Sequence, residues 1–389
     1  MTAPLRVGLV AGEASGDTLG ADLIKALRAL APGAFFFGVA GPKMQAQGCE
    51  TWEPSESLAV MGLVEILGDL PRLLRLRARI RRMFLVARPD VFVGIDAPEF
   101  NLNVARRLRA AGIPTVQYVS PQVWAWRQGR ARKMCQAVDL VLCLLPFEKR
   151  FYDGHGIRAE FVGHPLAEII PAVTDRAAAR AALGCNINAS VVALLPGSRR
   201  GEVGRLAADF AATAKWMAEH RAGLEFIAPL ASAATREIFA AAMRRGAPDV
   251  PVKLFDGQAQ TALIAADVVL VASGTASLEA ALCKRPMIVV YRLGMLSAWI
   301  LRRLNLVKLK FFAQPNLLAD RRIVSEYFQE TINPASMGAE LLQWLDDPAR
   351  RDALTVEFSR IHAELKRDAS VRAARAIISL VDGVMGSVV

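Results

Sequence analysis

Four polar turns, each placed directly after an apolar run, hold the residue types in this sequence that could bind a ligand or move a proton. The first turn is GEASGD at 12–17, which contains Glu13, Ser15 and Gly16. Its glycines would let a ligand approach the backbone closely, and an ordinary tight turn is the alternative interpretation. The turn lacks the G-x-G-x-x-G spacing of a dinucleotide fingerprint, so by itself it indicates a binding site only weakly.

The second turn follows the apolar run DVFVGI and begins with Asp96. A carboxylate at this place could take a proton from a hydroxyl group, as a general base does. It could equally cap the helix that is expected to follow, because aspartate is a common residue at helix starts. The residues alone leave both roles open.

The third turn, Gly197, Ser198 and Arg199, lies between an apolar run and a region of helical periodicity. Backbone N–H groups at the start of a helix, with a guanidinium beside them, suit a diphosphate. An exposed basic turn is the alternative. The G-x-x-x-x-G-K-[ST] pattern of an ATP-binding P-loop does not occur here, so the turn does not predict an ATP site of that type.

The fourth turn, Ser273, Gly274 and Thr275, opens a helical stretch that carries Glu279. A capping box would place a glutamate three residues after its cap, but Leu278 stands at that distance from Thr275. Capping therefore does not explain Glu279. A nucleotide ribose is the ligand that we expect for this carboxylate, and a solvated helix side chain is the alternative.

These turns need elements that hold them, and the sequence alternates short runs of valine, isoleucine, leucine and phenylalanine with longer stretches of helical periodicity. That alternation is typical of parallel βαβ units, in which ligands bind beyond the carboxyl ends of the strands. Strands are expected near 5–11, 34–40, 90–95, 114–119, 138–144, 158–162, 190–195, 224–228, 251–255, 267–271 and 286–290. Each of the four turns follows one of these strands.

The spacing of the strands predicts an α/β protein with two doubly wound, Rossmann-like domains. The first domain is expected at 1–168 and the second at 187–335, with a linker rich in alanine and arginine at 169–186. Residues 336–389 have helical periodicity throughout and should pack as C-terminal helices on one or both domains. A chain of 389 residues is long enough to form two separate cores.

The net charge is strongly positive, since 48 lysines and arginines against 37 aspartates and glutamates give +11 and a pI near 9.8. Such a protein usually meets an anionic partner: nucleic acid, anionic lipid or a phosphorylated substrate. The hydrophobic fraction of 53% and the mean hydropathy of +0.29 favour a lipid surface over nucleic acid. Apolar stretches such as 259–283 are interrupted by charged residues, so membrane contact should be peripheral.

Metal sites and disulfides are not indicated. The cysteines are scattered without a C-x-x-C pair, the histidines lack ligand spacing, and Asp-x-Asp does not occur, so we expect no metal and no cofactor. His164, in VGHPL, is expected to be a structural residue rather than a base. The first residues lack the charged region, longer apolar core and cleavage site of a signal peptide, so a cytoplasmic protein is expected.

The stretch 58–88, LAVMGLVEILGDLPRLLRLRARIRRMFLVAR, combines apolar residues at near-helical spacing with a cluster of arginines. That composition is typical of a helix that lies in a membrane interface, and an amphipathic helix packed on a Rossmann sheet is the alternative. The predicted membrane-facing residues are Leu73, Leu74, Leu76, Arg75, Arg79, Arg82 and Met83. A second basic and apolar stretch, 292–310, is expected to add to this surface.

Motifs placed in order along the chain resemble those of the lipid-A-disaccharide synthases. They are GEASGD (12–17), GPKM (41–44), LAVMGLVEIL (58–67), GIDAPEFN (94–101), YVSPQVWAWRQGR (118–130), PFEKRFY (146–152), FVGHPL (161–166), LLPGSR (194–199), SGTASLE (273–279) and PNLLA (315–319). The resemblance runs from about residue 5 to about residue 330, and the tryptophan-rich motif is its most specific part. It implies the GT-B fold, with UDP bound mainly by the second domain and a lipid acceptor mainly by the first.

The resemblance also implies a reaction. An inverting glycosyltransferase of this family joins UDP-2,3-diacylglucosamine to 2,3-diacylglucosamine 1-phosphate, called lipid X, and gives the β-1,6-linked lipid A disaccharide 1-phosphate and UDP. Asp96 would be its catalytic base. The implied donor-binding residues are Gly197, Ser198, Arg199, Ser273, Gly274, Thr275, Glu279 and Asn316. The implied residues on the acceptor side of the cleft are Glu13, Ser15 and Gly16.

The same likeness implies lipopolysaccharide biosynthesis in a Gram-negative bacterium, on the anionic cytoplasmic face of the inner membrane. Nucleic acid is not an expected partner, and a homodimer is left open. A different GT-B enzyme, such as a UDP-N-acetylglucosamine 2-epimerase or a peptidoglycan-type transferase, would share the UDP site but lack YVSPQVWAWR. A non-catalytic basic module on the membrane surface would bind UDP without turnover.

Overall fold

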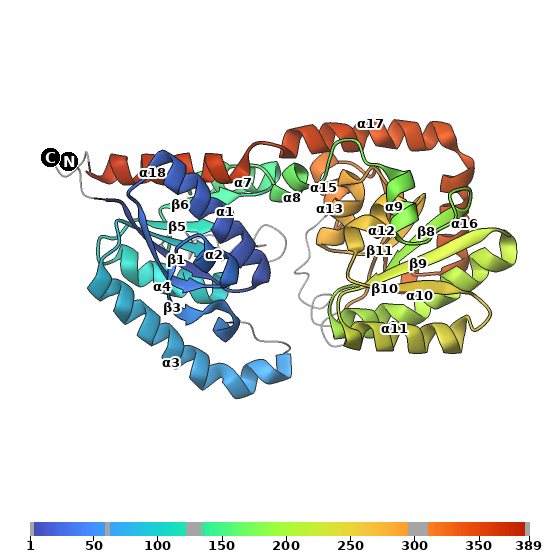
Figure 1. Cartoon of the computed structure of the whole chain (residues 1–389), viewed down its shortest axis with the longest axis horizontal. Coiled ribbons are helices and arrows are strands. Elements are labelled where there is room, and N and C mark those ends of the chain that lie inside the picture. The colour runs from blue at the N-terminus through green and yellow to red at the C-terminus, as the bar shows by residue number, and fades with distance from the viewer. Residues whose placement is uncertain (1–3, 59–62, 122–133, 135, 295–309, 386–389) are drawn as a thin grey trace. The chain divides into compact units, whose positions relative to one another are not determined.

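The structure is a computed structural model (Figure 1), and it describes residues 4–58, 63–121, 134, 136–294 and 310–385. The chain forms two compact units, each with its own sheet. The first unit comprises Met1–Pro165 and Leu365–Val389, and the second unit comprises Leu166–Glu364. Both sheets are parallel with helices packed on them, so the predicted α/β architecture of two doubly wound domains is confirmed.

The sheet of the first unit has the strand order β3-β2-β1-β4-β5-β6-β7, and all of its neighbouring strands pair in parallel. The strands are β1 (Arg6–Ala11), β2 (Phe35–Ala40), β3 (Glu50–Pro54), β4 (Val91–Ile95), β5 (Thr115–Tyr118), β6 (Leu140–Cys143) and β7 (Ala159–Phe161). The sequence predicts each of them except β3. That strand lies at the edge of the sheet, where the half-exposed sequence ETWEP offers no apolar run.

Helices cover both faces of this first sheet. They are α1 (Ala14–Leu30), α2 (Pro42–Ala46), the short 3-10 helix η1 (Ser55–Leu58), α3 (Leu63–Ala87), α4 (Pro98–Arg109), α7 (Pro146–Asp153) and α18 (Ala369–Met385). Side chains of β1 alternate between the two faces, as in any strand. Val7 and Leu9 pack in the cluster formed with α1 and α18, whereas Val10 packs with α3 and α4 on the other face.

The sheet of the second unit has the order β10-β9-β8-β11-β12-β13, again with parallel pairing throughout. The strands are β8 (Ser190–Leu195), β9 (Leu224–Leu230), β10 (Val252–Asp256), β11 (Val268–Ala272), β12 (Met287–Tyr291) and β13 (Ser325–Phe328). Only β13 is absent from the predicted set. It is a short edge strand, SEYF, that is half-buried along its whole length and contains a glutamate.

The helices that begin between Pro165 and Pro348 pack around this second sheet or join its strands. They are α8 (Pro165–Ile169), α9 (Arg176–Ala182), α10 (Arg200–His220), α11 (Ala233–Gly246), α12 (Ala259–Ala265), α13 (Thr275–Leu282), α15 (Gln314–Ala319), the 3-10 helix η3 (Gln329–Thr331), α16 (Pro334–Asp346) and α17 (Pro348–Leu365). The chain then returns to the first unit, where the red α18 lies beside the blue α1 (Figure 1). Among the helices described, none is both long enough and apolar enough to cross a membrane.

Each sheet has one place where the strand order reverses. In the first sheet it lies between β1 and β4, and in the second it lies between β8 and β11. The connections leave these neighbouring strands in opposite directions, so a space opens beyond their carboxyl ends, and ligands of open α/β sheets bind there. The two switch points are therefore where a site should be sought.

Candidate functional site

The four polar turns lie at these two switch points. In the first unit Ala11 of β1 is in register with Ile95 of β4, so GEASGD and Asp96 leave the sheet side by side. In the second unit Leu195 of β8 is in register with Val271 of β11, so the PGSR and SGT turns are neighbours too. The fold therefore brings the predicted residues together in two groups, one in each unit.

The first group depends on a close approach between two turns. A Cβ atom added to Gly12 would lie 2.5 Å from the Cβ of Ala97, so only glycine fits there. Glu13 and Ser15 are exposed and Gly16 is buried. Glu13 occupies the N-cap position of α1, but its side chain makes no capping hydrogen bond. Its carboxylate is not committed to the helix start.

Asp17, the last residue of GEASGD, has a structural role that the sequence analysis missed. Its buried carboxylate accepts hydrogen bonds from the backbone N–H groups of Gly41 (3.0 Å), Lys43 (2.9 Å) and Met44 (3.0 Å). These groups belong to the start of α2, where N–H groups lack helical partners. The motifs GEASGD and GPKM are thus joined by one carboxylate, which fixes the turn that carries Glu13.

Asp96 begins a strained turn. Its φ is +52° and that of Ala97 is +39°, a left-handed conformation that residues with a side chain seldom adopt. Ala97, and not Asp96, occupies the N-cap position of α4. Strain of this kind costs on the order of 1–3 kcal/mol per residue and is concentrated at functional sites. Asp96 is half-buried and does not occupy the cap position of α4.

The turn at Gly197, Ser198 and Arg199 already holds an anionic group. The carboxylate of Glu202 accepts hydrogen bonds from the backbone N–H of Ser198 (3.3 Å) and of Arg199 (3.4 Å). The Arg199 guanidinium donates to the same carboxylate at 3.4 Å, and its side chain is 78% exposed. Glu202 was not among the predicted residues; it is the third residue of α10, where a glutamate can reach back to the backbone N–H at the cap. The donors of this turn can therefore hold an anion.

The SGT turn connects β11 to the segment around Phe312. The Ser273 hydroxyl donates to the carbonyl of Phe312 at 3.2 Å, while Gly274 and Thr275 are exposed at the start of α13. Burial raises the pKa of Glu279, and its half-buried carboxylate finds no hydrogen-bond partner among the described residues. A carboxylate that is desolvated without a protein partner is a candidate for contact with a ligand.

Asn316 does not have a free polar group. It is fully buried, and its amide donates to the carbonyl of Val324 (2.9 Å) and to Glu326 (2.8 Å). Its amide oxygen accepts from the N–H groups of Ile323 (2.8 Å) and Val324 (3.0 Å), so its whole hydrogen-bonding capacity is used. The Asn316 amide therefore holds the chain around it, and its predicted part in donor binding stays a prediction.

Glu326, which the sequence analysis missed, explains the role of Asn316. Besides the amide of Asn316, its carboxylate accepts from the backbone N–H groups of Phe312 (3.1 Å) and Ala313 (2.8 Å). Because Ser273 donates to the Phe312 carbonyl, the PNLLA motif is tied to the SGT turn through this carboxylate. Asn316 and Glu326 thus hold the backbone next to the predicted donor residues.

The predicted membrane-facing residues lie on two different sides of helix α3, one packed against the core and one exposed. Leu76 and Met83 are partly buried and pack against the core of the first unit, and Leu73 is half-buried. Leu74 is 44% exposed, and Arg75, Arg79 and Arg82 are exposed, with Arg79 paired to Glu53. Leu76 and Met83 therefore lie on the side of the helix that packs against the core, whereas Leu74 and the arginines lie on its exposed side.

Two apolar residues on the exposed side of α3 were not predicted to contact a membrane. Leu85 is 37% exposed and Val86 is 81% exposed. Arg302, Arg303 and Lys308, basic residues of the predicted stretch 292–310, lie outside the described residues. So do residues 122–130 of the motif YVSPQVWAWRQGR, which spans 118–130. From the second basic stretch, Lys310 is exposed.

His164 lies where the chain leaves the first unit. Its backbone N–H donates to the carbonyl of Leu365 at 2.9 Å, which ties the outgoing chain to the returning one. Burial lowers the pKa of His164 to about 4, so the ring is neutral near pH 7. A structural role agrees with this geometry. Within the described part of the chain, no group of three His, Cys, Asp or Glu side chains is arranged to hold a metal ion.

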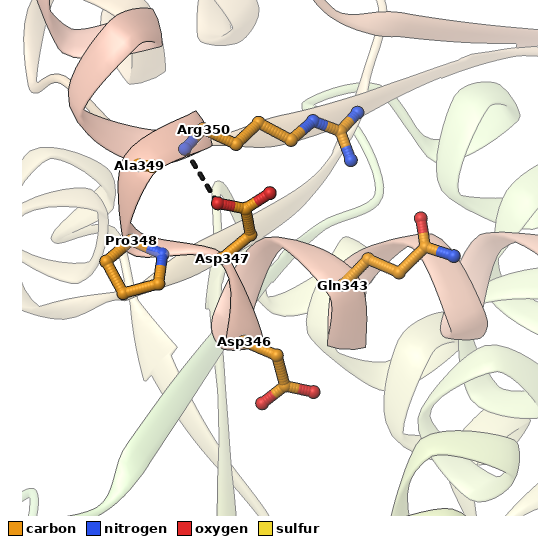
Figure 2. A pocket seen from close by; sticks show the side chains of 6 residues that line it. All are labelled: Gln343, Asp346, Asp347, Pro348, Ala349 and Arg350. Atoms are coloured by element: carbon orange, nitrogen blue, oxygen red, sulfur yellow. Dashed lines mark hydrogen bonds between the residues drawn. The ribbon is translucent and has the colours of Figure 1, made fainter.

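A surface hollow at the turn between α16 and α17 lies apart from the predicted residues. Figure 2 shows the residues that line it, Gln343, Asp346, Asp347, Pro348, Ala349 and Arg350. Asp347 accepts a 2.8 Å hydrogen bond from the backbone N–H of Arg350, and Asp346 forms a 2.5 Å ion pair with Arg221. These charged groups are used within the fold, and the hollow is not the candidate site.

Comparison with known proteins gives matches over nearly the whole chain. The sequence profile of the family described as lipid-A-disaccharide synthetase matches residues 7–379. A relative named lipid-A-disaccharide synthase, from Pseudomonas aeruginosa (strain UCBPP-PA14), is 53% identical over 379 residues. That match covers 97% of this chain and 98% of the relative.

Solved structures share the fold at much lower identity. The UDP-GlcNAc 2-epimerase from Neisseria meningitidis, solved with bound UDP-GlcNAc, has a TM-score of 0.59 and 13% identity, with 96% of this chain and 98% of that chain covered. CalG4, the calicheamicin glycosyltransferase, has a TM-score of 0.58 and 14% identity, with 98% and 100% covered. At such identities the likeness shows the fold alone, and that fold is GT-B.

The fold by itself does not separate an epimerase from a glycosyltransferase, because both structures share it. The sequence does separate them, since the synthase relative is 53% identical whereas the epimerase is 13% identical. Other members of the GT-B group are thereby set aside. The chain is a glycosyltransferase of the hexosyltransferase type, and it belongs to the lipid-A-disaccharide synthetase family.

Proposed function

We propose that this enzyme transfers 2,3-diacylglucosamine from UDP to the 6-hydroxyl group of 2,3-diacylglucosamine 1-phosphate, with inversion at the anomeric carbon. The products are the β-1,6-linked disaccharide 1-phosphate and UDP. Family membership supports the substrates, and the two groups of polar turns at the switch points support binding of a nucleotide and of a second sugar.

The observation that carries the proposal is the position of Asp96. It stands at the carboxyl end of β4, at the switch point of the first sheet, in a strained turn that α4 does not need as its cap. Inversion by a single displacement requires a base on the face of the sugar opposite the leaving group. As the acceptor oxygen forms its bond to the anomeric carbon, Asp96 takes the hydroxyl proton and the bond to UDP breaks.

The acceptor would lie against the GEASGD turn beside Asp96. Glu13 and Ser15 supply exposed polar groups there, and Gly16 lets the ligand approach α1 closely. The acyl chains of the acceptor do not need polar contacts. These three residues would therefore orient the sugar and its phosphate rather than its lipid portion.

The donor diphosphate would bind at Gly197, Ser198 and Arg199. The leaving UDP gathers negative charge as the glycosidic bond forms, and the N–H groups and guanidinium of this turn can meet it. Glu202 marks the position, because its carboxylate takes up the same N–H groups in the structure. A bound diphosphate would displace that carboxylate. The diphosphate would then be held without a carboxylate-bound metal ion.

The nucleoside part of the donor would lie at the SGT turn. Gly274 and Thr275 are exposed at the start of α13, and Ser273 is fixed by its bond to Phe312. Glu279 would accept hydrogen bonds from the ribose hydroxyl groups, which would give this half-buried carboxylate the partners that it lacks among the described residues. Asn316 would act indirectly, by holding the neighbouring backbone through Glu326.

Both proposed substrates carry acyl chains, so the enzyme would work peripherally on the cytoplasmic face of the inner membrane. The exposed side of α3 supports this location. Leu74, Leu85 and Val86 are exposed there, near Arg75 and Arg82. Apolar groups beside arginines suit the boundary between acyl chains and anionic head groups.

A product analysis tests the proposal. The purified enzyme is given the UDP-linked and the 1-phosphorylated diacylglucosamines, and the products are examined by mass spectrometry and by NMR of the anomeric proton. A disaccharide 1-phosphate with a β linkage, together with UDP, is expected. Turnover of unacylated UDP-sugars in preference to acylated ones would favour another UDP-sugar enzyme, and UDP binding without any product would favour a non-catalytic membrane module.

A further inference from the structure

Two buried side-chain amides converge on one backbone carbonyl, that of Asp96. The Asn101 amide donates to this oxygen at 2.8 Å, and the Gln117 amide donates to it at 3.0 Å. Asn101 is completely buried in α4, and Gln117 is 1% exposed in β5. On its other side, the backbone N–H of Asp96 donates to the carbonyl of Tyr118 at 2.9 Å. The main chain of Asp96 is thus held at both of its polar groups.

Gln117 is an unusual residue for its place. Strands of a parallel sheet covered on both faces are normally apolar throughout, and a buried amide is costly unless its hydrogen bonds are made. Among the described residues, the Gln117 amide donates to the carbonyls of Asp96, of Tyr118 (3.3 Å), the last residue of β5, and of Val119 (3.2 Å). Its polar group therefore serves the turns at this end of the sheet.

Those turns are the strained ones. Val119 has a φ of +73°, which is rare for a β-branched residue, and Asp96 and Ala97 also have positive φ. Gln117 donates to the carbonyls of Asp96 and Val119, so one amide joins the turn that follows β4 to the turn that follows β5. Strained backbone persists only where surrounding contacts determine it.

Asn101 reaches the same place from the other side. A Cβ atom on Gly94 of β4 would lie 2.7 Å from the Cβ of Asn101, so the strand carries glycine where the helix side chain presses against it. From there the Asn101 amide also contacts the carbonyls of Ile95 (3.3 Å) and Val10 (3.4 Å). It ties the ends of β1 and β4 together beneath Asp96.

We propose that Gln117 and Asn101 are positioning residues for Asp96, which hold its strained backbone so that the carboxylate keeps one direction toward the acceptor hydroxyl. The proposal rests on the proposed function, in which Asp96 is the base. Neither amide touches substrate in this scheme. Their contribution is the orientation of a reacting group, and a displacement of about 1 Å in such a group can lower a rate about 10²-fold.

Gln117→Met tests the proposal, because methionine has nearly the length of glutamine but donates no hydrogen bond. Thr115→Val is the matched control. Thr115 is fully buried in the same strand, and its hydroxyl is bonded to Ala137 (3.2 Å) and Asp139 (2.9 Å) at the opposite end of the sheet. Both variants lose buried hydrogen bonds, but only one loses contact with Asp96.

We expect Gln117→Met to lower kcat by about 10- to 100-fold with nearly unchanged KM for the donor and unchanged UDP affinity. Thr115→Val should stay within about threefold of the wild-type kcat, even if its melting temperature falls as far as that of Gln117→Met. Similar kcat losses in the two variants would mean that Gln117 acts only through stability. Should Gln117→Met not fold, Gln117→Leu replaces it, since it also removes the N–H donors and adds neither a charge nor a new donor.

A double-mutant cycle separates this proposal from the proposed function. If Gln117 acts through Asp96, adding Gln117→Met to Asp96→Asn should change kcat by less than about threefold, because little is left to position. Multiplying effects would overturn the positioning role. An active Asp96→Asn enzyme would overturn the base assignment and this proposal with it. An impaired Asp96→Asn enzyme beside an unimpaired Gln117→Met enzyme would overturn the positioning role alone.

Discussion

At the scale of single residues, Asp96 directly precedes the N-cap residue of α4, and its proposed role as a base can be tested by substitution. Asp96→Asn keeps the shape of the side chain and removes its basicity. We expect kcat to fall by about 10²- to 10⁴-fold, which is the usual contribution of a general base, while UDP affinity stays nearly unchanged. Initial rates of disaccharide formation and calorimetry with UDP measure the two quantities.

Asp90 provides the control for that substitution. It precedes β4 at the opposite end of the strand, where it accepts a 2.7 Å hydrogen bond from the backbone N–H of Arg6. Asp90→Asn should leave kcat within a few-fold of wild type. An Asp96→Asn enzyme that is equally active would show that its carboxylate is not the base.

Arg199 differs from lysine in the fork of donors that it can offer to a diphosphate. Arg199→Lys keeps the charge but loses two-point hydrogen bonding, so we expect kcat to fall at least about tenfold. Arg200→Lys, a change at the next exposed arginine, is the control. Steady-state kinetics of both variants decide the matter, and equal effects at the two positions would argue against a specific diphosphate contact.

At the scale of elements, α3 presents one side to the core and another to solvent. Leu74, Leu85 and Val86 are all exposed. A triple variant with Leu74→Ser, Leu85→Ser and Val86→Ser should co-sediment less with anionic vesicles and keep nearly the same melting temperature. High salt should release part of the bound wild-type protein, because arginines contribute to the attraction. Vesicle sedimentation at low and high salt measures both effects.

Two further sets of variants complete that test. Serine at Val173 and Val356, exposed residues of the second unit, should leave vesicle binding unchanged. Serine at Leu76 or Met83 should lower the free energy of unfolding by about 1–3 kcal/mol, because both pack on the core. Unaltered vesicle binding in the Leu74, Leu85 and Val86 variant would remove α3 from the proposed membrane surface.

Much of the element level could be predicted from sequence. Apolar runs bounded by glycine, proline or aspartate gave every central strand of both sheets, because such strands are buried on both faces. Of the four edge strands, β7 and β10 were predicted, whereas β3 and β13 were missed because their half-exposed sequences contain glutamate and no apolar run. Helical spacing found the apolar side of α3 but could not say whether a sheet or a membrane covers it.

At the scale of the whole molecule, the donor set around the phosphate turn predicts how the enzyme responds to chelators. The turn offers N–H groups and a guanidinium, which already hold the carboxylate of Glu202 and can hold a diphosphate in the same way. Activity should therefore persist after thorough treatment with EDTA. Rates measured before and after chelation, with and without added magnesium, check this. Strict dependence on the added cation would contradict the proposed diphosphate site.

The pH dependence of stability should reflect His164. Burial lowers its pKa to about 4 from an ordinary 6.5. Between these two pH values, His164 is therefore protonated in the unfolded chain and neutral in the folded chain. This contribution is complete above pH 6.5 and is lost as the pH falls toward 4. Urea unfolding at pH 7 and at about pH 5 should show a smaller loss of stability for His164→Gln than for wild type. Exposed His220→Gln is the control and should behave as wild type.

The sequence by itself determined the features that follow from local rules. Alternating apolar runs and helical stretches gave two parallel α/β sheets, and the rule for ligand position in such sheets placed the four turns at strand ends. Ordered motifs gave the family. Asp96 and the PGSR and SGT turns could be chosen as candidates because each interrupts an apolar pattern at a defined place.

Only the tertiary structure decided what those polar groups contact. Asn101 and Gln117 both donate to the carbonyl of Asp96. All the hydrogen bonds of the Asn316 amide are made with neighbouring protein groups, and the Glu202 carboxylate accepts from the backbone of the PGSR turn. A hydrogen bond depends on distances of a few ångström between atoms whose residues can stand far apart in the chain. Hydrophobic patterning predicts which side of an element is buried. It does not predict which polar group a buried side chain will contact, because strand order and register determine that partner.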